Sequence, residues 1–148
     1  MKKLLIISIS IMIILALASS AMAKAVQLDL LPYVAAAEGS GKVILNNPLG
    51  AVNFIVQVNI EGAQTNHTYV VWIFAASGGD FSGFDEYSNS GWYNLGELIT
   101  DEFGNGSFHL NIALPGTGLL SGIEVALNEV SPPTGRQYSS EVGEIEIK

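Results

Sequence analysis

The amino-acid sequence predicts an all-β protein built as two antiparallel sheets packed face to face. Apolar and polar side chains alternate along several stretches after Lys24, and turn-forming residues separate these stretches at short intervals. No stretch shows a sustained 3.6-residue period. Because alternate side chains of a strand point to opposite faces, each stretch would turn one apolar face toward a shared core. Seven or eight short strands are expected.

The clearest strand spans residues 51–60, where Val52, Phe54, Val56, Val58 and Ile60 share one face. Residues 68–76 are apolar on both faces and rich in aromatic and β-branched side chains, which predicts a central strand. Further strands are expected at residues 26–30, 43–45, 92–100, 107–114, 123–128 and 145–147.

Two local patterns refine this prediction. Leu95 and Leu98 lie three positions apart in an otherwise alternating stretch, which predicts a β-bulge. Residues 101–106 read Asp-Glu-Phe-Gly-Asn-Gly, which predicts a tight turn between two strands.

The first 23 residues have the features of a secretory signal peptide. A short basic start precedes an uncharged apolar run, and small residues at Ala21 and Ala23 provide a cleavage site. The alternative is an uncleaved membrane anchor, because residues 4–23 are long enough to span a bilayer. Either way, residues 24–148 are expected to form one exported domain, secreted or held at the cell surface.

Composition excludes several classes of function. The chain has 6 basic and 14 acidic residues, a net charge of −8, and removal of Lys2 and Lys3 with the leader would make it −10. Such an acidic chain is not expected to bind nucleic acid, which needs a basic surface. The absence of cysteine excludes disulfides, thiolate metal sites and a thiol nucleophile.

About 40 residues resemble a known family. The residues concerned are Tyr69-x-x-Trp72 and Leu95-Gly96-x-Leu98-x-Thr100-Asp101-x-x-Gly104-Asn105-Gly106. They resemble the extracytoplasmic domain of anti-sigma factors and similar exported modules, and this resemblance implies an immunoglobulin-like β-sandwich. Sigma-factor binding is not expected, because only Met1-Lys2-Lys3 precedes the apolar run where that family has a cytoplasmic helical domain.

The longest irregular segment, residues 77–91, is the main candidate for a ligand site. Phe81, Phe84 and Tyr87, with Trp92 and Tyr93 just beyond, lie among Asp, Asn and Ser side chains. Flat rings beside polar groups are suited to binding carbohydrate. The alternative is that the rings anchor the loop to the sandwich.

Other candidate sites are weaker. Asp80, Asp85 and Glu86 supply oxygens to which calcium could bind, although their spacing is not that of an EF-hand. His67 and His109 are the only histidines, and Ser107 lies too far along its strand from His109 for a nucleophile–base pair. Asn66 and Asn105 begin N-glycosylation sequons at expected turns.

We therefore expect an exported, non-catalytic module that is structural, adhesive or protein-binding at the cell envelope, with no required cofactor. Amide-rich strand faces at Asn53, Gln57, Asn59, Asn111 and Asn128 are either a surface for a second copy or another envelope protein, or ordinary solvated sheet. The alternatives are a carbohydrate-binding module and a secreted hydrolase.

Overall fold

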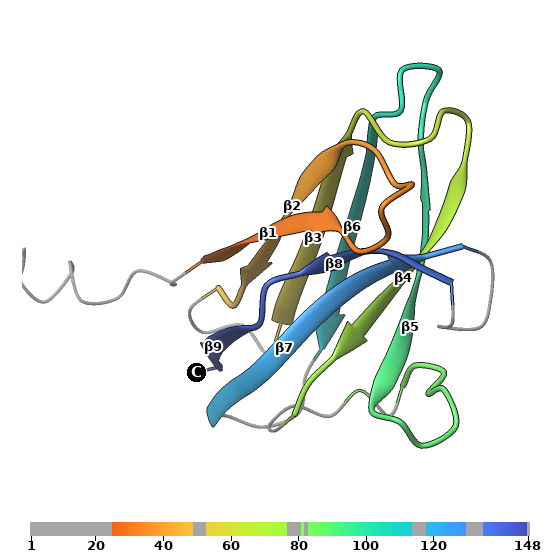
Figure 1. Cartoon of the computed structure of the whole chain (residues 1–148). Helices are drawn as coiled ribbons and strands as arrows, with labels where there is room; N and C mark the ends of the chain where they lie inside the picture. Colours follow the sequence, from red (N-terminus) through yellow and green to blue (C-terminus); the bar gives the residue numbers. More distant parts are fainter. Residues whose placement is uncertain are drawn as a thin grey trace, which may run out of the picture.

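The structure is a computed structural model that describes residues 25–48, 53–76, 81, 83–113, 118–129 and 135–147. Within these residues the chain is all-β and has no α-helix (Figure 1), which confirms the predicted class. None of the described segments is therefore a helix of membrane-spanning length and hydrophobicity. The leader predicted for residues 1–23 lies outside the described residues.

The described residues contain nine strands. They are β1 (Val26–Pro32), β2 (Ser40–Asn46), β3 (Asn53–Glu61), β4 (Thr68–Phe74), β5 (Trp92–Ile99), β6 (Gly106–Ala113), β7 (Gly118–Asn128), β8 (Arg136–Ser140) and β9 (Gly143–Ile147).

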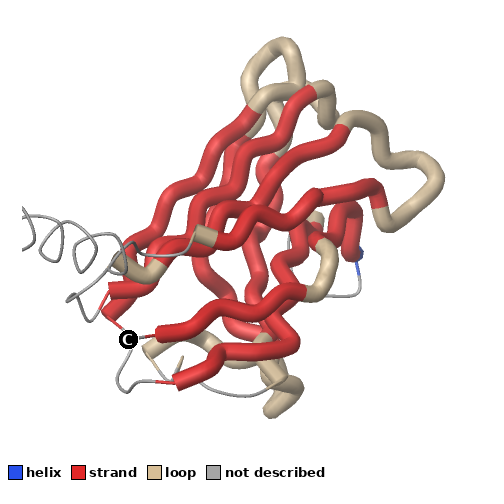
Figure 2. The backbone as a smooth tube through the Cα atoms, turned by 90° about the vertical axis from the view of Figure 1, so that its left-hand side faces the viewer, coloured by secondary structure: helices blue, strands red, loops and turns tan. Residues whose placement is uncertain are grey.

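The strands form one continuous antiparallel sheet with the order β5-β4-β7-β8-β1-β2-β3-β6, and β9 pairs with β7. The two separate sheets expected from the sequence are joined because β8 pairs with β7 on one side and with β1 on the other. The sheet curls round so that its end strands β5 and β6 meet at a Thr100–Gly106 bridge and diverge beyond it (Figures 1 and 2). The result is a nearly closed barrel.

The core contains the alternating side chains predicted for β3, except that Val52 lies outside the described residues. Phe54, Val56, Val58 and Ile60 on β3 are all buried against apolar side chains of the opposite wall. The central position predicted for residues 68–76 is also confirmed, since β4 lies between β5 and β7.

The predicted bulge lies in β5. Val71 pairs with Gly96 and Trp72 pairs with Asn94, so Leu95 is the extra residue. Gly96 has a φ of 134° and a Cβ there would lie 3.2 Å from the Phe108 ring. The bulge therefore brings the β5 backbone close to a side chain of β6, the strand at the other end of the sheet.

Strand β8 was not predicted, because its sequence Arg-Gln-Tyr-Ser-Ser lacks an apolar alternation. Its single large apolar residue, Tyr138, is fully buried and its hydroxyl donates a 2.5 Å hydrogen bond to the Glu38 carbonyl. Burial raises the pKa of Tyr138 well above its ordinary value. One buried ring and backbone pairing on both edges thus make a strand where the side-chain pattern gives little signal.

The turn between β5 and β6 is fastened to the loop between β3 and β4. Asp101 Oδ1 accepts hydrogen bonds from the backbone N–H groups of Phe103 and Asn105, at 2.9 and 2.8 Å. Thr100 accepts from His67 N–H through its hydroxyl oxygen, and its own N–H donates to the His67 carbonyl, both at 2.9 Å. These hydrogen bonds hold together the corner of the barrel at which β5 and β6 meet.

Candidate functional site

The five aromatic residues of the predicted carbohydrate site lie on two different sides of the sheet. Phe81 is only 3% exposed and stacks on Tyr93 with the ring centroids 5.4 Å apart. Phe84 is partly buried against the same core. Phe81, Phe84 and Tyr93 thus pack against the core, as expected of rings that anchor the loop.

Tyr87 and Trp92 instead cover the outer face of β4. The Tyr87 ring meets Trp72 edge-on with centroids 6.3 Å apart, and the Trp92 ring lies 5.4 Å from that of Phe74. The structure therefore does not bring the five predicted rings together on one flat surface.

Residues 85–91 fold back along the free edge of β5. Tyr87 N–H donates to the Trp92 carbonyl at 2.9 Å, and Asn94 N–H donates to the Asp85 carbonyl at 3.0 Å. Ser88 and Asn89 have left-handed φ angles of 48° and 56°, which reverse the chain. Part of the segment expected to be irregular is thus a short hairpin that covers one end of β5.

The calcium candidates are only partly described. Asp80 lies outside the described residues, whereas Asp85 and Glu86 are both exposed. Glu86 Oε1 accepts a 2.8 Å hydrogen bond from Gly91 N–H, so this carboxylate holds the hairpin closed. Among the described residues, no three His, Asp or Glu side chains come together in a way that could hold a metal ion.

The outer face also carries a contact that sequence reasoning missed. The Arg136 guanidinium lies 4.9 Å from the Tyr33 ring centroid and 4.7 Å from the Trp92 ring centroid. Its Nη1 atom also lies 2.7 Å from Glu124 Oε1, an oxygen that accepts a further hydrogen bond from the Ser139 hydroxyl. We call Tyr33, Trp92, Glu124, Arg136 and Ser139 the arginine–aromatic surface.

One signal for this surface was present in the sequence. Arg136 is the only arginine of the chain, and arginine stacks readily on aromatic rings. Its partners come from three other parts of the chain: Tyr33 follows β1, Trp92 begins β5 and Glu124 lies in β7. The pairing of β8 with β1 and β7, and of β4 with β7 and β5, brings them together.

Two polar groups are buried beneath the loops on this side of the sheet. Trp72 and Asn128 are 5% and 1% exposed, and Trp72 Nε1 and Asn128 Oδ1 have no hydrogen-bond partner. Asn128 was expected on an amide-rich outer face with Asn53, Gln57 and Asn59. Those three are half-buried, so Asn128 differs from them in being shielded from solvent.

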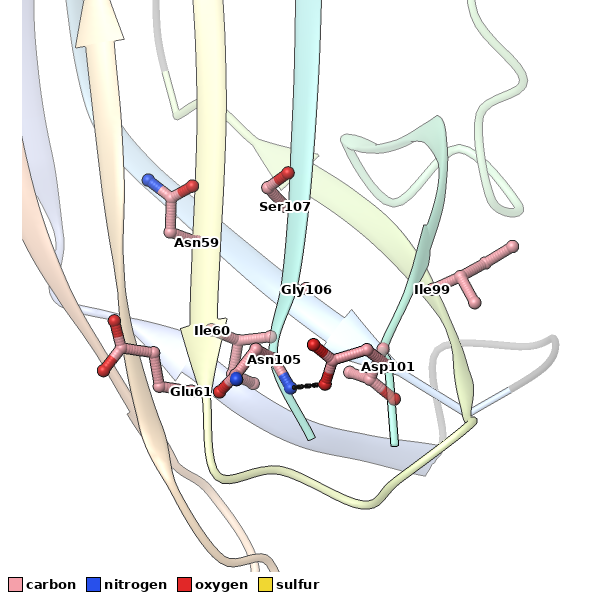
Figure 3. A pocket seen from close by; sticks show the side chains of 9 residues that line it. Asn59, Ile60, Glu61, Ile99, Asp101, Asn105, Gly106 and Ser107 are labelled. Atoms are coloured by element: carbon pink, nitrogen blue, oxygen red, sulfur yellow. Dashed lines mark hydrogen bonds between the residues drawn. The ribbon is translucent and has the colours of Figure 1, made fainter. Parts of the chain in front are cut away.

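A shallow pocket of about 920 Å³ lies at the corner where β5 and β6 meet (Figure 3). Its lining comes from the ends of β3 and β5, the start of β6 and the turn between them. Ile99 is 65% exposed at one side, and Asp101 is hydrogen-bonded to Asn105 near the turn. The pocket thus adjoins the last strand of the sheet.

The histidines and the sequons are separated. His67 packs edge-on against the Tyr69 ring at 4.6 Å, and His109 is exposed on β6. Within the described residues, no hydrogen bond joins either histidine ring to a carboxylate. Asn66 is exposed with a left-handed φ of 49°, whereas the Asn105 side chain accepts from Gly62 N–H at 3.4 Å and bonds to Asp101.

Comparison of this chain with protein-family models, with curated proteins and with solved structures found no match in any of the three.

Proposed function

We propose that the protein is an exported, non-catalytic module that binds another protein at the cell envelope through the arginine–aromatic surface. On this view its fold is an immunoglobulin-like variant of the β-sandwich, used as a scaffold. Residues 1–23 would direct export and be removed, or would remain as an anchor.

The observation that carries the proposal is the position of Arg136 between two rings on an outer face of the sheet. Tryptophan, tyrosine and arginine dominate the energetically important positions of protein interfaces. Tyr33 is 62% exposed although its ring contacts Arg136, so a partner could bury it without rearrangement of the sheet. Because Arg136 contacts both Tyr33 and Glu124, the Tyr33 ring and the guanidinium are held in place before a partner binds. This lowers the conformational entropy lost on association.

The non-catalytic part of the proposal rests on the surroundings of the titratable groups. His67 packs against a tyrosine ring, and Glu86 and Glu124 serve as hydrogen-bond acceptors for Gly91, Arg136 and Ser139. These side chains support the structure of loops and strands. A hydrolase would need a nucleophile and a base within hydrogen-bond reach of each other.

Carbohydrate binding is the second candidate, and Tyr87 and Trp92 favour it because both rings remain half-exposed. A sugar must stack on a free ring face. The Trp92 ring already has Phe74 and Arg136 as neighbours, which leaves less of it for a sugar. A protein partner fits the arrangement better, because it can contact the exposed Tyr33 ring in addition to the remaining part of Trp92.

Site-specific photo-crosslinking tests the proposal. A benzophenone amino acid replaces Tyr33 in the full chain, produced in its own cells, and the matched control replaces Leu119, which is 54% exposed at one end of β7. We expect a protein adduct from position 33 that is lost in the Arg136→Ala background, and none from position 119. An adduct that glycosidases rather than proteases remove would favour carbohydrate; equal adducts from both positions, or none, would contradict the proposal.

A further inference from the structure

The last strand of the sheet, β6, has an edge without a partner strand. Within the described residues, β6 pairs with β3 along its whole length on one side, and on the other only Gly106 is bridged, to Thr100. The N–H and C=O groups along such an edge are a template on which another strand can form.

The apolar face of β6 is correspondingly incomplete. Phe108 pairs with Val58 and Leu110 pairs with Val56. The two valines are fully buried, whereas Phe108 and Leu110 are only partly buried against the core. The Phe108 ring also lies close to the β5 backbone at Gly96, so a strand added beyond β6 would cover Leu110 and the part of Phe108 that remains exposed.

The edges of β5 and β9 are protected, and that of β6 is not. Residues 85–87 cover β5 from Trp92 to Asn94, and the bulge at Leu95 follows directly. Strand β9 carries Glu144 and Glu146. Strand β6 reads Gly-Ser-Phe-His-Leu-Asn-Ile-Ala, without lysine, proline, carboxylate or bulge, which are the usual means of preventing strand addition.

Charge indicates the chemistry of the partner. Glu97 is exposed on β5, and Glu61, Asp101 and Glu102 are exposed at the corner where β5 and β6 meet and from which the open edge begins. Of the two described Lys or Arg residues, Lys42 lies on β2, two strands from β6, and pairs with Asp29, and Arg136 belongs to the arginine–aromatic surface. A basic segment would be attracted to this edge, whereas a second copy would bring the same carboxylates and be repelled.

We propose that the free edge of β6 binds an extended segment of another protein by β-strand addition, and that this segment alternates apolar with Lys or Arg residues. Backbone hydrogen bonds to β6 would supply affinity, as in other cases of strand addition. The apolar side chains would cover Phe108 and Leu110, and the basic side chains would face Glu97 and the carboxylates near the pocket of Figure 3. This site is separate from the arginine–aromatic surface and does not depend on it.

The test uses the full chain and a nine-residue peptide that alternates lysine and valine. We expect backbone amide signals of residues 106–113 to shift and become protected from hydrogen exchange when the peptide binds. Two control peptides separate the contributions. Replacement of lysine by glutamate removes the charge attraction, and N-methylation of alternate residues removes the backbone hydrogen bonds, so both should abolish binding.

A pair of protein variants tests the position of the site. Glu97→Lys on β5 should weaken binding of the lysine peptide roughly fivefold, whereas Glu144→Lys on β9, equally exposed, should leave it unchanged. Absence of binding at millimolar peptide, binding that survives N-methylation, or shifts confined to the residues around Tyr33 would overturn the proposal. So would concentration-dependent dimers with protected β6 amides, which would identify a second copy as the occupant.

Discussion

Gly104 lies against the backbone of Ala63 so closely that a Cβ on Gly104 would be 2.0 Å from the Ala63 carbonyl oxygen. Gly104 also has a left-handed φ of 78°, and its own carbonyl accepts a 3.0 Å hydrogen bond from Ala63 N–H. We therefore expect Gly104→Ala to lower the free energy of unfolding by more than about 3 kcal/mol, through backbone strain and this clash. Gly83→Ala is the control, because nothing lies within 4 Å of a Cβ at Gly83. Urea denaturation of both variants measures the difference; similar midpoints would contradict the tight fit of the corner.

Removal of the Arg136 side chain should destabilise the protein, although this side chain lies at the surface. Its side chain is 23% exposed and contacts Glu124 and two rings. We expect Arg136→Ala to cost about 2 kcal/mol and to change the fluorescence of Trp92. Lys42→Ala is the control, since Lys42 and Asp29 are more than half exposed at 3.7 Å and their pair should contribute less than about 0.5 kcal/mol. Equal losses in the two variants would mean that the stacked arrangement contributes nothing.

The turn at Asp101 should contribute to stability in a pH-dependent way. Backbone hydrogen bonds from Asn105 and Phe103 lower the pKa of Asp101 below its ordinary value of 3.8. A carboxylate with a lowered folded-state pKa stabilises the fold above its unfolded-state pKa, and the contribution is lost as the pH falls through the folded-state pKa. Asp101→Ala should therefore be less stable than the natural chain at pH 7, with a difference that shrinks below about pH 4. Thermal unfolding between pH 2 and 7 checks this, with Glu102→Gln as the neighbouring control; a gap that stays constant with pH would rule it out.

Truncation to alanine should lower the stability of the protein much more at Phe81 than at Tyr33. Phe81 is 3% exposed and stacked on Tyr93, so Phe81→Ala should cost about 3 kcal/mol of unfolding free energy. Tyr33 is 62% exposed, so Tyr33→Ala should change stability by less than about 1 kcal/mol. Calorimetry on both variants separates an anchoring ring from one that is available to a partner. A Phe81→Ala variant of natural stability would reopen a binding role for the loop.

The sequence predicted strands where side chains alternate and failed where backbone pairing alone makes the strand. β3 was recognisable because four inward residues, Phe54 to Ile60, occupy every second position. The bulge at Leu95 was recognisable for the same reason, since it interrupts such a pattern. β8 has no comparable pattern, and its existence depends on partners that lie far away in the chain.

The candidate site was less predictable than the fold. Phe81 and Trp92 were assigned to one site because they lie close together in the sequence. Neighbouring side chains of a strand, such as Trp92 and Tyr93, however point to opposite faces of the sheet. Tyr93 accordingly contacts Phe81 on the core side, whereas Trp92 contacts Arg136 on the outer face. The contact of Arg136 with Tyr33 depends on the order of strands in the sheet, which alternation does not reveal.

The pairing of β1 with β8 joins residues that lie far apart in the sequence, since Leu30 is opposite Ser140. During synthesis the barrel wall therefore cannot close until β8 has been made. Until then β1 and β7 each lack the neighbour that links the two halves, and both remain open to misassembly with other nascent chains. Correct folding thus depends on keeping the incomplete polypeptide extended or bound by chaperones until β8 can pair with both β7 and β1.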